Sequence, residues 1–177
     1  ITIQNTKVSN FVRGLNIVSA SRYHVLQSYF LASDAAIIQN QLWGDSGDGE
    51  MMGNTFVAAV AGSHNTVTYN SGGALRFVGN KVLAQASISN CIEIAWNYVT
   101  SVGPFMAANS IEGSCVNGIS IDGNVPLNSG TITGGEIAVS GTGISATASV
   151  AQPAWTITGV VVRTSSNNTG LSLANMT

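Results

Sequence analysis

One eight-residue pattern recurs along this chain of 177 residues and constrains its fold more than any other feature. An apolar residue, any residue and a second apolar residue are followed by two more positions, an asparagine, one residue and a third apolar residue. The closest copies are 75–82 (LRFVGNKV), 92–99 (IEIAWNYV) and 119–126 (ISIDGNVP). Looser copies lie at 49–56 (GEMMGNTF) and 137–144 (IAVSGTGI), the second with Thr142 in place of asparagine. Repetition of this kind is typical of a solenoid, in which each repeat adds one coil to a stack.

A second column of isoleucines indicates the length of one coil. Each of these isoleucines ends a short apolar stretch before a turn residue: Ile88, Ile111, Ile132 and Ile157. Their spacings of 21 to 25 residues suit one coil of a parallel β-helix with insertions at its turns. We therefore predict an all-β fold, a right-handed parallel β-helix. The competing sandwich and jelly-roll folds predict no column that repeats once per coil.

Alternation along each strand predicts which side chains face the core. The inward set of two neighbouring coils is Ile92, Ile94 and Val99, followed by Ile119, Ile121 and Pro126. The asparagines of the repeated corner are expected to adopt left-handed backbone geometry and to hydrogen bond from coil to coil. They are Asn54, Asn80, Asn97 and Asn124.

The composition agrees with this fold and excludes several classes of function. Charged residues make up only 8% of the chain, and Asn, Ser, Thr and Gly, which favour turns and strands over helices, take their place. A net charge of −2 with six scattered cations lacks the basic surface that nucleic-acid binding requires. No apolar run approaches the roughly 18 to 20 residues of a membrane-spanning helix. We expect neither nucleic-acid binding nor membrane insertion.

Alignment of the coils on the repeated asparagine also predicts two columns of outward-facing side chains, each with one residue per coil. The first is a ladder of charges in which neighbouring coils pair, and it reads Glu50, Arg76, Glu93, Ser120. The second is too apolar for free solvent, and it reads Met52, Val78, Ala95, Asp122. An apolar outer face predicts an oligomer, with a parallel trimer about the solenoid axis as the natural arrangement.

These coils and the low-charge, Asn-, Ser-, Thr- and Gly-rich composition resemble bacteriophage tailspike proteins and the related pectate-lyase-like β-helix family. The resemblance covers residues 1–145 at the level of the coil pattern, and no catalytic signature matches residue by residue. It implies a homotrimeric spike on the virion tail that binds bacterial surface polysaccharide, capsule or O-antigen, and often cleaves it. Residues 146–177 are expected to form the last coils, a cap or a trimerisation element, and the chain to be part of a longer one.

Glu93 and Asp122 are the candidate catalytic pair. A glycosidase needs two carboxylates, about 5 Å apart for retention of configuration and about 6.5–9.5 Å apart for inversion. Both acids are predicted to face outward from the same strand stack, in adjacent coils and two positions apart, which gives a separation on the order of 8 Å. The alternative is that Glu93 pairs with Arg76 and that Asp122 caps the turn at Gly123. No cofactor is expected.

Other polar and aromatic residues are candidates for binding. The candidate substrate-binding residues are Trp43, Trp96, Tyr98 and Arg76. Aromatic rings stack on sugars, but aromatic residues at coil corners also pack within the fold. A Gly-rich segment with Asp45, Asp48 and Glu50 is a weak candidate for a calcium loop, and a solvated insertion loop is the alternative.

The two cysteines and the two histidines complete the reactive groups. Cys91 and Cys115 lie one coil apart, and we expect them to stack as buried thiols, with a disulfide as the alternative. His24 and His64 have no predicted partner.

Three functions remain open. The first is a phage spike segment that binds and depolymerises host polysaccharide, by hydrolysis rather than elimination. The second is a non-catalytic structural or adhesive β-solenoid, such as a tail-fibre shaft or a surface adhesin. The third is a secreted polysaccharide lyase, which would favour clustered cations to stabilise its intermediate and is weakened by their scatter.

Overall fold

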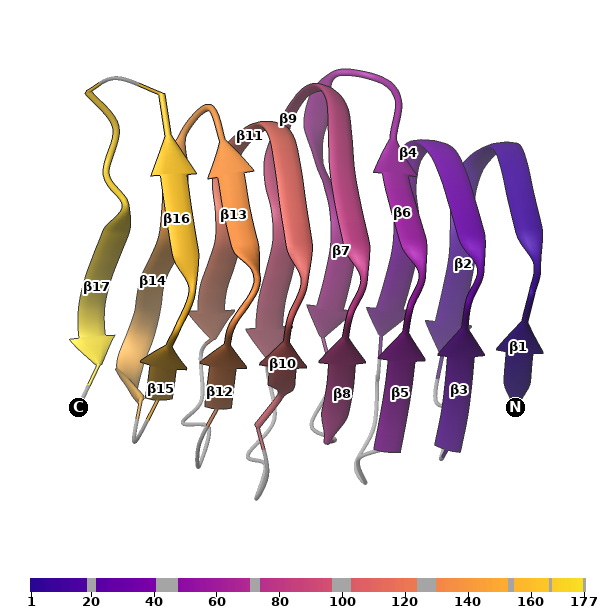
Figure 1. Ribbon diagram of the computed structural model, residues 1–177, viewed down its shortest axis with the longest axis horizontal. Coiled ribbons are helices and arrows are strands. Elements are labelled where there is room, and N and C mark those ends of the chain that lie inside the picture. Colours follow the sequence, from indigo (N-terminus) through magenta and orange to yellow (C-terminus); the bar gives the residue numbers. More distant parts are fainter. Residues whose placement is uncertain are drawn as a thin grey trace.

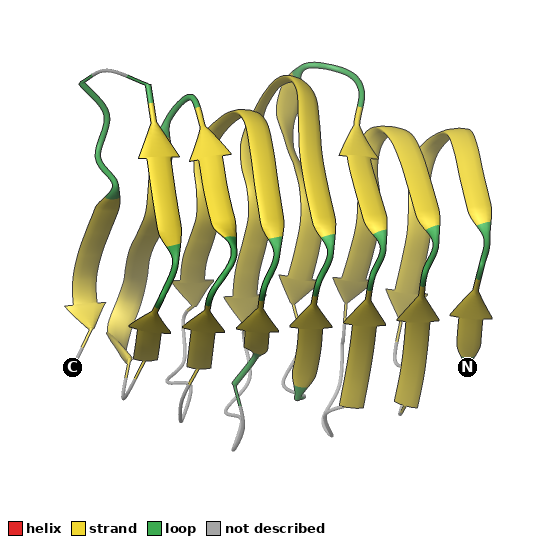
Figure 2. Cartoon of the chain, viewed as in Figure 1, coloured by secondary structure: helices red, strands yellow, loops and turns green. Residues whose placement is uncertain are grey.

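A computed structural model describes residues 1–18, 22–40, 48–70, 74–96, 103–123, 130–152, 155–165 and 167–176. The regular structure of these residues is β-strand (Figure 2), and the strands stack coil on coil along one long axis with the two termini at opposite ends (Figure 1). The described part of the chain holds no helix long and apolar enough to cross a membrane. The predicted all-β, parallel solenoid is confirmed.

Two sheets form the walls of the solenoid, and all their strand pairs are parallel. Among the described residues the first sheet has seven short strands, in the order β1 (Thr2–Gln4), β3 (Arg22–Leu26), β5 (Asp48–Met52), β8 (Leu75–Val78), β10 (Phe105–Ala107), β12 (Gly130–Thr133) and β15 (Trp155–Thr158). Each strand of this sheet therefore lies one coil from the next.

The second sheet holds the longer strands, which bend across the opposite side of each coil (Figure 1). Its main order, from the N-terminal end, is β2 (Lys7–Val18), β4 (Tyr29–Asn40), β6 (Thr55–Ala58), β9 (Lys81–Trp96), β11 (Ser110–Gly123), β13 (Glu136–Val139) and β16 (Val161–Thr164). Beside this path lie β7 (Gly62–Asn70), β14 (Thr142–Gln152) and β17 (Leu171–Met176). The first half of β9 pairs with β6 and its second half with β7, so one long strand spans two shorter ones.

The core is a stack of aliphatic and aromatic side chains inside the coils. The predicted inward residues Ile92, Ile94, Ile119 and Ile121 are all buried, and Ile92 pairs with Ile119 as expected. Val99 and Pro126 lie outside the described residues. Alternation of inward and outward side chains was therefore correctly predicted within the second sheet.

A buried asparagine ladder joins the coils at the turn between the sheets. The backbone N–H of Asn54 donates to Asn80 Oδ1 at 2.9 Å, and the N–H of Asn80 donates to Asn109 Oδ1 at 2.9 Å. Each side-chain Nδ2 also donates to a carbonyl of the preceding coil, as Asn80 does to Met51 at 2.8 Å. The ladder is confirmed for Asn54 and Asn80, but the next member is Asn109 and not Asn97.

The ladder prediction went wrong because one sequence pattern occurs in both sheets. Residues 75–78 form β8 of the first sheet and pair with β5 and β10, whereas residues 92–96 belong to β9 of the second sheet. An apolar-x-apolar strand looks the same in either place, since alternation alone does not identify the sheet. Asn97 and Asn124 lie outside the described residues.

Left-handed backbone geometry occurs one residue before each ladder position, so the prediction that the asparagines themselves adopt it is wrong for Asn54 and Asn80. One residue per coil has φ between 48° and 65° at this turn: Asn5, Gln27, Gly53, Gly79, Ala108, Gly134 and Gly159. Glycine is favoured there because it adopts positive φ without steric cost. The preceding residue makes the bend, which leaves the asparagine free to bond between coils.

The other predicted columns are divided between the two sheets. Ile132 and Ile157 pair in the first sheet as predicted, but Ile88 pairs with Cys115 and Ile111 with Val82 in the second. The predicted charge column likewise separates into a Glu50–Arg76 pair and a Glu93–Ser120 pair. The apolar column separates into Met52–Val78 and Ala95–Asp122.

Cys91 and Cys115 form a disulfide between adjacent coils, so the expectation of stacked free thiols is wrong. Their Cα atoms are 5.6 Å apart, within the usual range for a disulfide, and both side chains are fully buried. The link joins β9 to β11 next to a register irregularity between Gly113 and Cys115. The disulfide thus cross-links the coils where their backbone ladder is interrupted.

Candidate active site

Glu93 and Asp122 lie on the two central strands of the second sheet. Glu93 of β9 is in register with Ser120 of β11, and Asp122 is in register with Ala95. The acids therefore occupy adjacent coils two positions apart, which is the arrangement that alternation predicted. Their part in catalysis stays a prediction.

The two acids have different surroundings. Glu93 is half-buried, and its burial, followed by the nearby charge of Asp122, raises the pKa of its carboxyl group. Hydrogen bonds from Asn65 and Thr68 act in the opposite direction. Asp122 is exposed to solvent. A carboxyl group with a raised pKa beside a solvent-exposed carboxyl group is the kind of pairing that a general acid and a general base require.

A second asparagine ladder leads to Glu93. Asn117 Nδ2 donates to Asn90 Oδ1 at 2.8 Å, and Asn90 Nδ2 donates to Asn65 Oδ1 at 2.8 Å. Asn65 Nδ2 then donates to Glu93 Oε2 at 2.9 Å. Sequence reasoning missed this ladder, although Asn65, Asn90 and Asn117 are one coil apart and their spacing was a usable signal.

Hydroxyl side chains extend from Glu93 along the solenoid axis. Thr68 occupies the equivalent position in the preceding coil, and Ser120 and Ser145 occupy it in the two following coils. Parallel coils repeat about every 4.8 Å, so these hydroxyls form a row at that interval. Thr68 is partly buried, whereas Ser120 and Ser145 are each only 8% exposed, so the row is largely covered.

Arg76 belongs to a separate cluster on the outer face of the first sheet. It pairs with Glu50, Nε to Oε1 at 3.8 Å, and Glu50 Oε2 lies 3.0 Å from His24 Nδ1. The structure thus does not bring Arg76 to Glu93, and the alternative that these two pair is wrong. His24, for which no partner was predicted, does have one. The cluster borders a shallow hollow of about 410 Å³ that Arg22 and Asp48 also line.

Several predicted binding residues lie outside the described part of the chain. They are Trp43, Tyr98 and Asp45, and for Trp96 the structure describes only the backbone, at the end of β9. Asp48 and Glu50 lie in β5, opposite Arg22 and His24. Within the described residues no group of three or more His, Cys, Asp or Glu is arranged to hold a metal ion.

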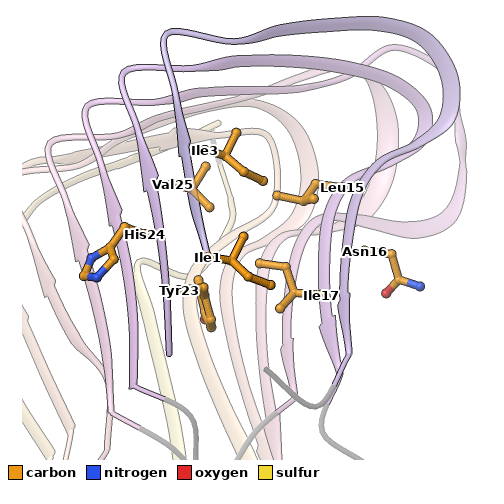
Figure 3. A pocket seen from close by; sticks show the side chains of 8 residues that line it. All are labelled: Ile1, Ile3, Leu15, Asn16, Ile17, Tyr23, His24 and Val25. Atoms are coloured by element: carbon orange, nitrogen blue, oxygen red, sulfur yellow. The ribbon is translucent and has the colours of Figure 1, made fainter. Parts of the chain in front are cut away.

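A further hollow of about 280 Å³ lies at the N-terminal end of the solenoid. It is lined by apolar side chains that include the exposed Ile1, the partly buried Ile3 and Leu15 and the buried Ile17, whereas His24 and Asn16 lie on the outer sides of the two sheets (Figure 3). The walls of the hollow are therefore mainly apolar, and the side chains of His24 and Asn16 face away from it.

No known family model, curated protein or solved structure matches this chain. The fold therefore rests on its own strand pairing, a parallel β-solenoid. The function rests on the residues around Glu93 and Asp122.

Proposed function

We propose that this chain is a segment of a bacteriophage spike that binds and depolymerises a bacterial surface polysaccharide, capsule or O-antigen. The observation that carries the proposal is the pairing of half-buried Glu93 with exposed Asp122 on adjacent coils. The reaction is glycoside hydrolysis, with Glu93 as general acid and Asp122 as general base.

The spacing of the pair supports inversion of configuration. One coil step combined with one two-residue step separates the two positions by about 8 Å, which leaves room for a water molecule beside the sugar. Glu93 donates its proton to the leaving glycosidic oxygen as the bond to the anomeric carbon breaks. Asp122 takes a proton from the water that attacks the opposite face of that carbon. The raised pKa of Glu93 favours the protonated acid that this step needs.

Substrate contact is proposed at Glu93 and Asp122 themselves, because Asp122 is exposed and Glu93 is only half-buried.

The assembly is proposed to be a parallel homotrimer of right-handed β-helices on the virion tail. An apolar column on the outer face of the first sheet supports it, since Leu26, Met52 and Val78 are in register there and only partly buried. Such a column is more apolar than the one predicted from sequence, which included Asp122. Light scattering is expected to give about three times the chain mass of 18.2 kDa, and a monomer would favour a secreted lyase instead.

The test is release of reducing ends from a panel of capsular and O-antigen polysaccharides. Glu93→Gln and Asp122→Asn are each expected to lower the rate by at least about 100-fold, the usual contribution of general acid–base catalysis. Glu136→Gln is the matched control, because Glu136 pairs with Arg163 at the exposed surface of β13. Unchanged rates in both site variants would refute the assignment. Wild-type protein that binds a polysaccharide without cleaving it would indicate an adhesive solenoid.

A further inference from the structure

The side-chain amide of Asn65 has both its oxygen and its nitrogen engaged. Its Oδ1 accepts from Asn90 Nδ2 at 2.8 Å. Its Nδ2 donates to Glu93 Oε2 at 2.9 Å and to Thr68 Oγ1 at 3.1 Å. An amide nitrogen carries two hydrogens, so these two bonds use its full donor capacity. The orientation of the amide is therefore determined by its neighbours.

The neighbouring amides determine the direction of the whole ladder. Asn117 donates to Asn90, and Asn90 donates to Asn65, so both of these amides direct their nitrogen to the preceding coil, whereas Asn65 directs its nitrogen to Thr68 and Glu93. If the side-chain amide of Asn65 were flipped, its Nδ2 would face Asn90 Nδ2 and its Oδ1 would face the Glu93 carboxylate. Both contacts are repulsive, and hydrogen bonds in such a chain strengthen one another. The Asn65 amide therefore presents an N–H donor, and no acceptor, to Glu93 Oε2.

We propose that Asn65 is a positioning residue that confines the acidic proton of Glu93 to Oε1. The inference rests on the proposed function and deepens it. An N–H group cannot accept a hydrogen bond, so a proton on Oε2 would face a second hydrogen and lose its bond. The neutral acid therefore carries its proton on Oε1, and Oε2 stays the acceptor of Asn65. Glu93 thus delivers its proton from one defined oxygen, as general acid catalysis demands.

The groups around Glu93 are consistent with this role. The flanking strand β7 contributes the neutral side chains of Asn65 and Thr68, and β11 contributes Asp122, whose charge acts on Glu93. Hydrogen bonds donated to a carboxylate favour its charged form and so lower its pKa. Loss of Asn65 should therefore add to the upward shift that burial and Asp122 already produce.

The experiment measures the Glu93 titration by carbon NMR and, in parallel, the pH profile of polysaccharide cleavage. Asn65→Ala is expected to raise the pKa of Glu93 by about one unit, since it removes one hydrogen bond to the charged form. It should lower kcat about tenfold or more with little change in KM. Asn117→Ala is the matched control, because it shortens the same ladder and leaves the Asn65–Glu93 bond in place.

A purely structural ladder would give a different result. Both variants would then lower thermal stability alike, and the pKa of Glu93 would stay at its wild-type value, which would overturn the proposal. If Asn65→Ala does not fold, the wild-type side-chain amide signals of Asn65 decide the question, because they should shift with the Glu93 midpoint. Amide signals that do not respond would overturn it as well. Wild-type protein without cleavage activity would refute the proposed function, while the titration still tests whether Asn65 holds Glu93.

Discussion

Asn80 gives the sharpest test of the forces that hold the coils together. Its side chain is 1% exposed and lies in the middle of the buried ladder. Asn80 Oδ1 accepts the backbone N–H of Asn54, and its Nδ2 donates to the carbonyl of Met51. Asn80→Ala leaves the backbone N–H of Asn54 buried without its acceptor, and such a group costs about 1–3 kcal/mol. The free energy of unfolding should therefore fall by about 2 kcal/mol, the middle of that range.

Urea unfolding followed by circular dichroism measures this loss, and amide hydrogen exchange at Asn54 locates it. Asn16→Ala is the control, because Asn16 is exposed and lies on the outer side of its sheet (Figure 3), and it should change stability by less than about 0.5 kcal/mol. Exchange at Asn54 should accelerate far more than exchange in the last coils, since the contacts of a solenoid are between neighbouring coils. A loss below about 1 kcal/mol with unchanged protection at Asn54 would contradict the reasoning, because the ladder would then contribute little.

Two further predictions concern the bonds between β9 and β11. The double variant Cys91→Ala/Cys115→Ala should have a free energy of unfolding about 3 kcal/mol lower than the oxidised protein, as expected when a disulfide that closes a loop with a sequence separation of 24 is removed. A double variant as stable as the oxidised protein would contradict this prediction. Glu112 accepts a hydrogen bond from Ser110 and pairs with Lys81, which together lower the pKa of its carboxyl group. That stabilisation is present at neutral pH and is lost as the pH falls through the lowered pKa. Glu112→Gln should therefore cost a few tenths of a kcal/mol at pH 7, because the pair is solvent-exposed. The cost should disappear as the pH falls through the lowered pKa, which thermal melts along an acid pH series would show.

The fold was predictable because its signals repeat once per coil. A buried asparagine such as Asn80 must recur wherever the chain makes the same turn, and its period is visible in the sequence. The sheet assignment was not predictable in the same way, because alternation distinguishes inside from outside and nothing more. Asn109 was not predicted, because Pro104 and Ala108 stand where the copies at 75–82 and 119–126 have an aliphatic strand residue and glycine.

The candidate site was predicted in part for the same reason. Glu93 and Asp122 both lie in the second sheet, so the error in assigning sheets did not affect their relative placement. Arg76 lies in the first sheet, and the same error placed it beside Glu93. Asn65 was not predictable as a partner of Glu93, because its side chain reaches across a coil to a residue three positions beyond its own register partner, Asn90.

Both ladders are built from asparagine side chains, but they have different effects on the protein. In the buried ladder the amides bond to backbone groups between coils, so their effect is on stability. In the second ladder the amides bond to one another and end on an ionisable group, so their arrangement affects the protonation of Glu93. The disulfide lies beside this second ladder, with Cys91 two residues before Glu93 and Cys115 two residues before Asn117. Because it joins the two coils that carry Glu93 and Asp122, it restricts their relative motion where the strand register is irregular. The proposed site spans two coils and therefore needs that restriction, since a displacement of one coil relative to the other would change the separation of Glu93 and Asp122.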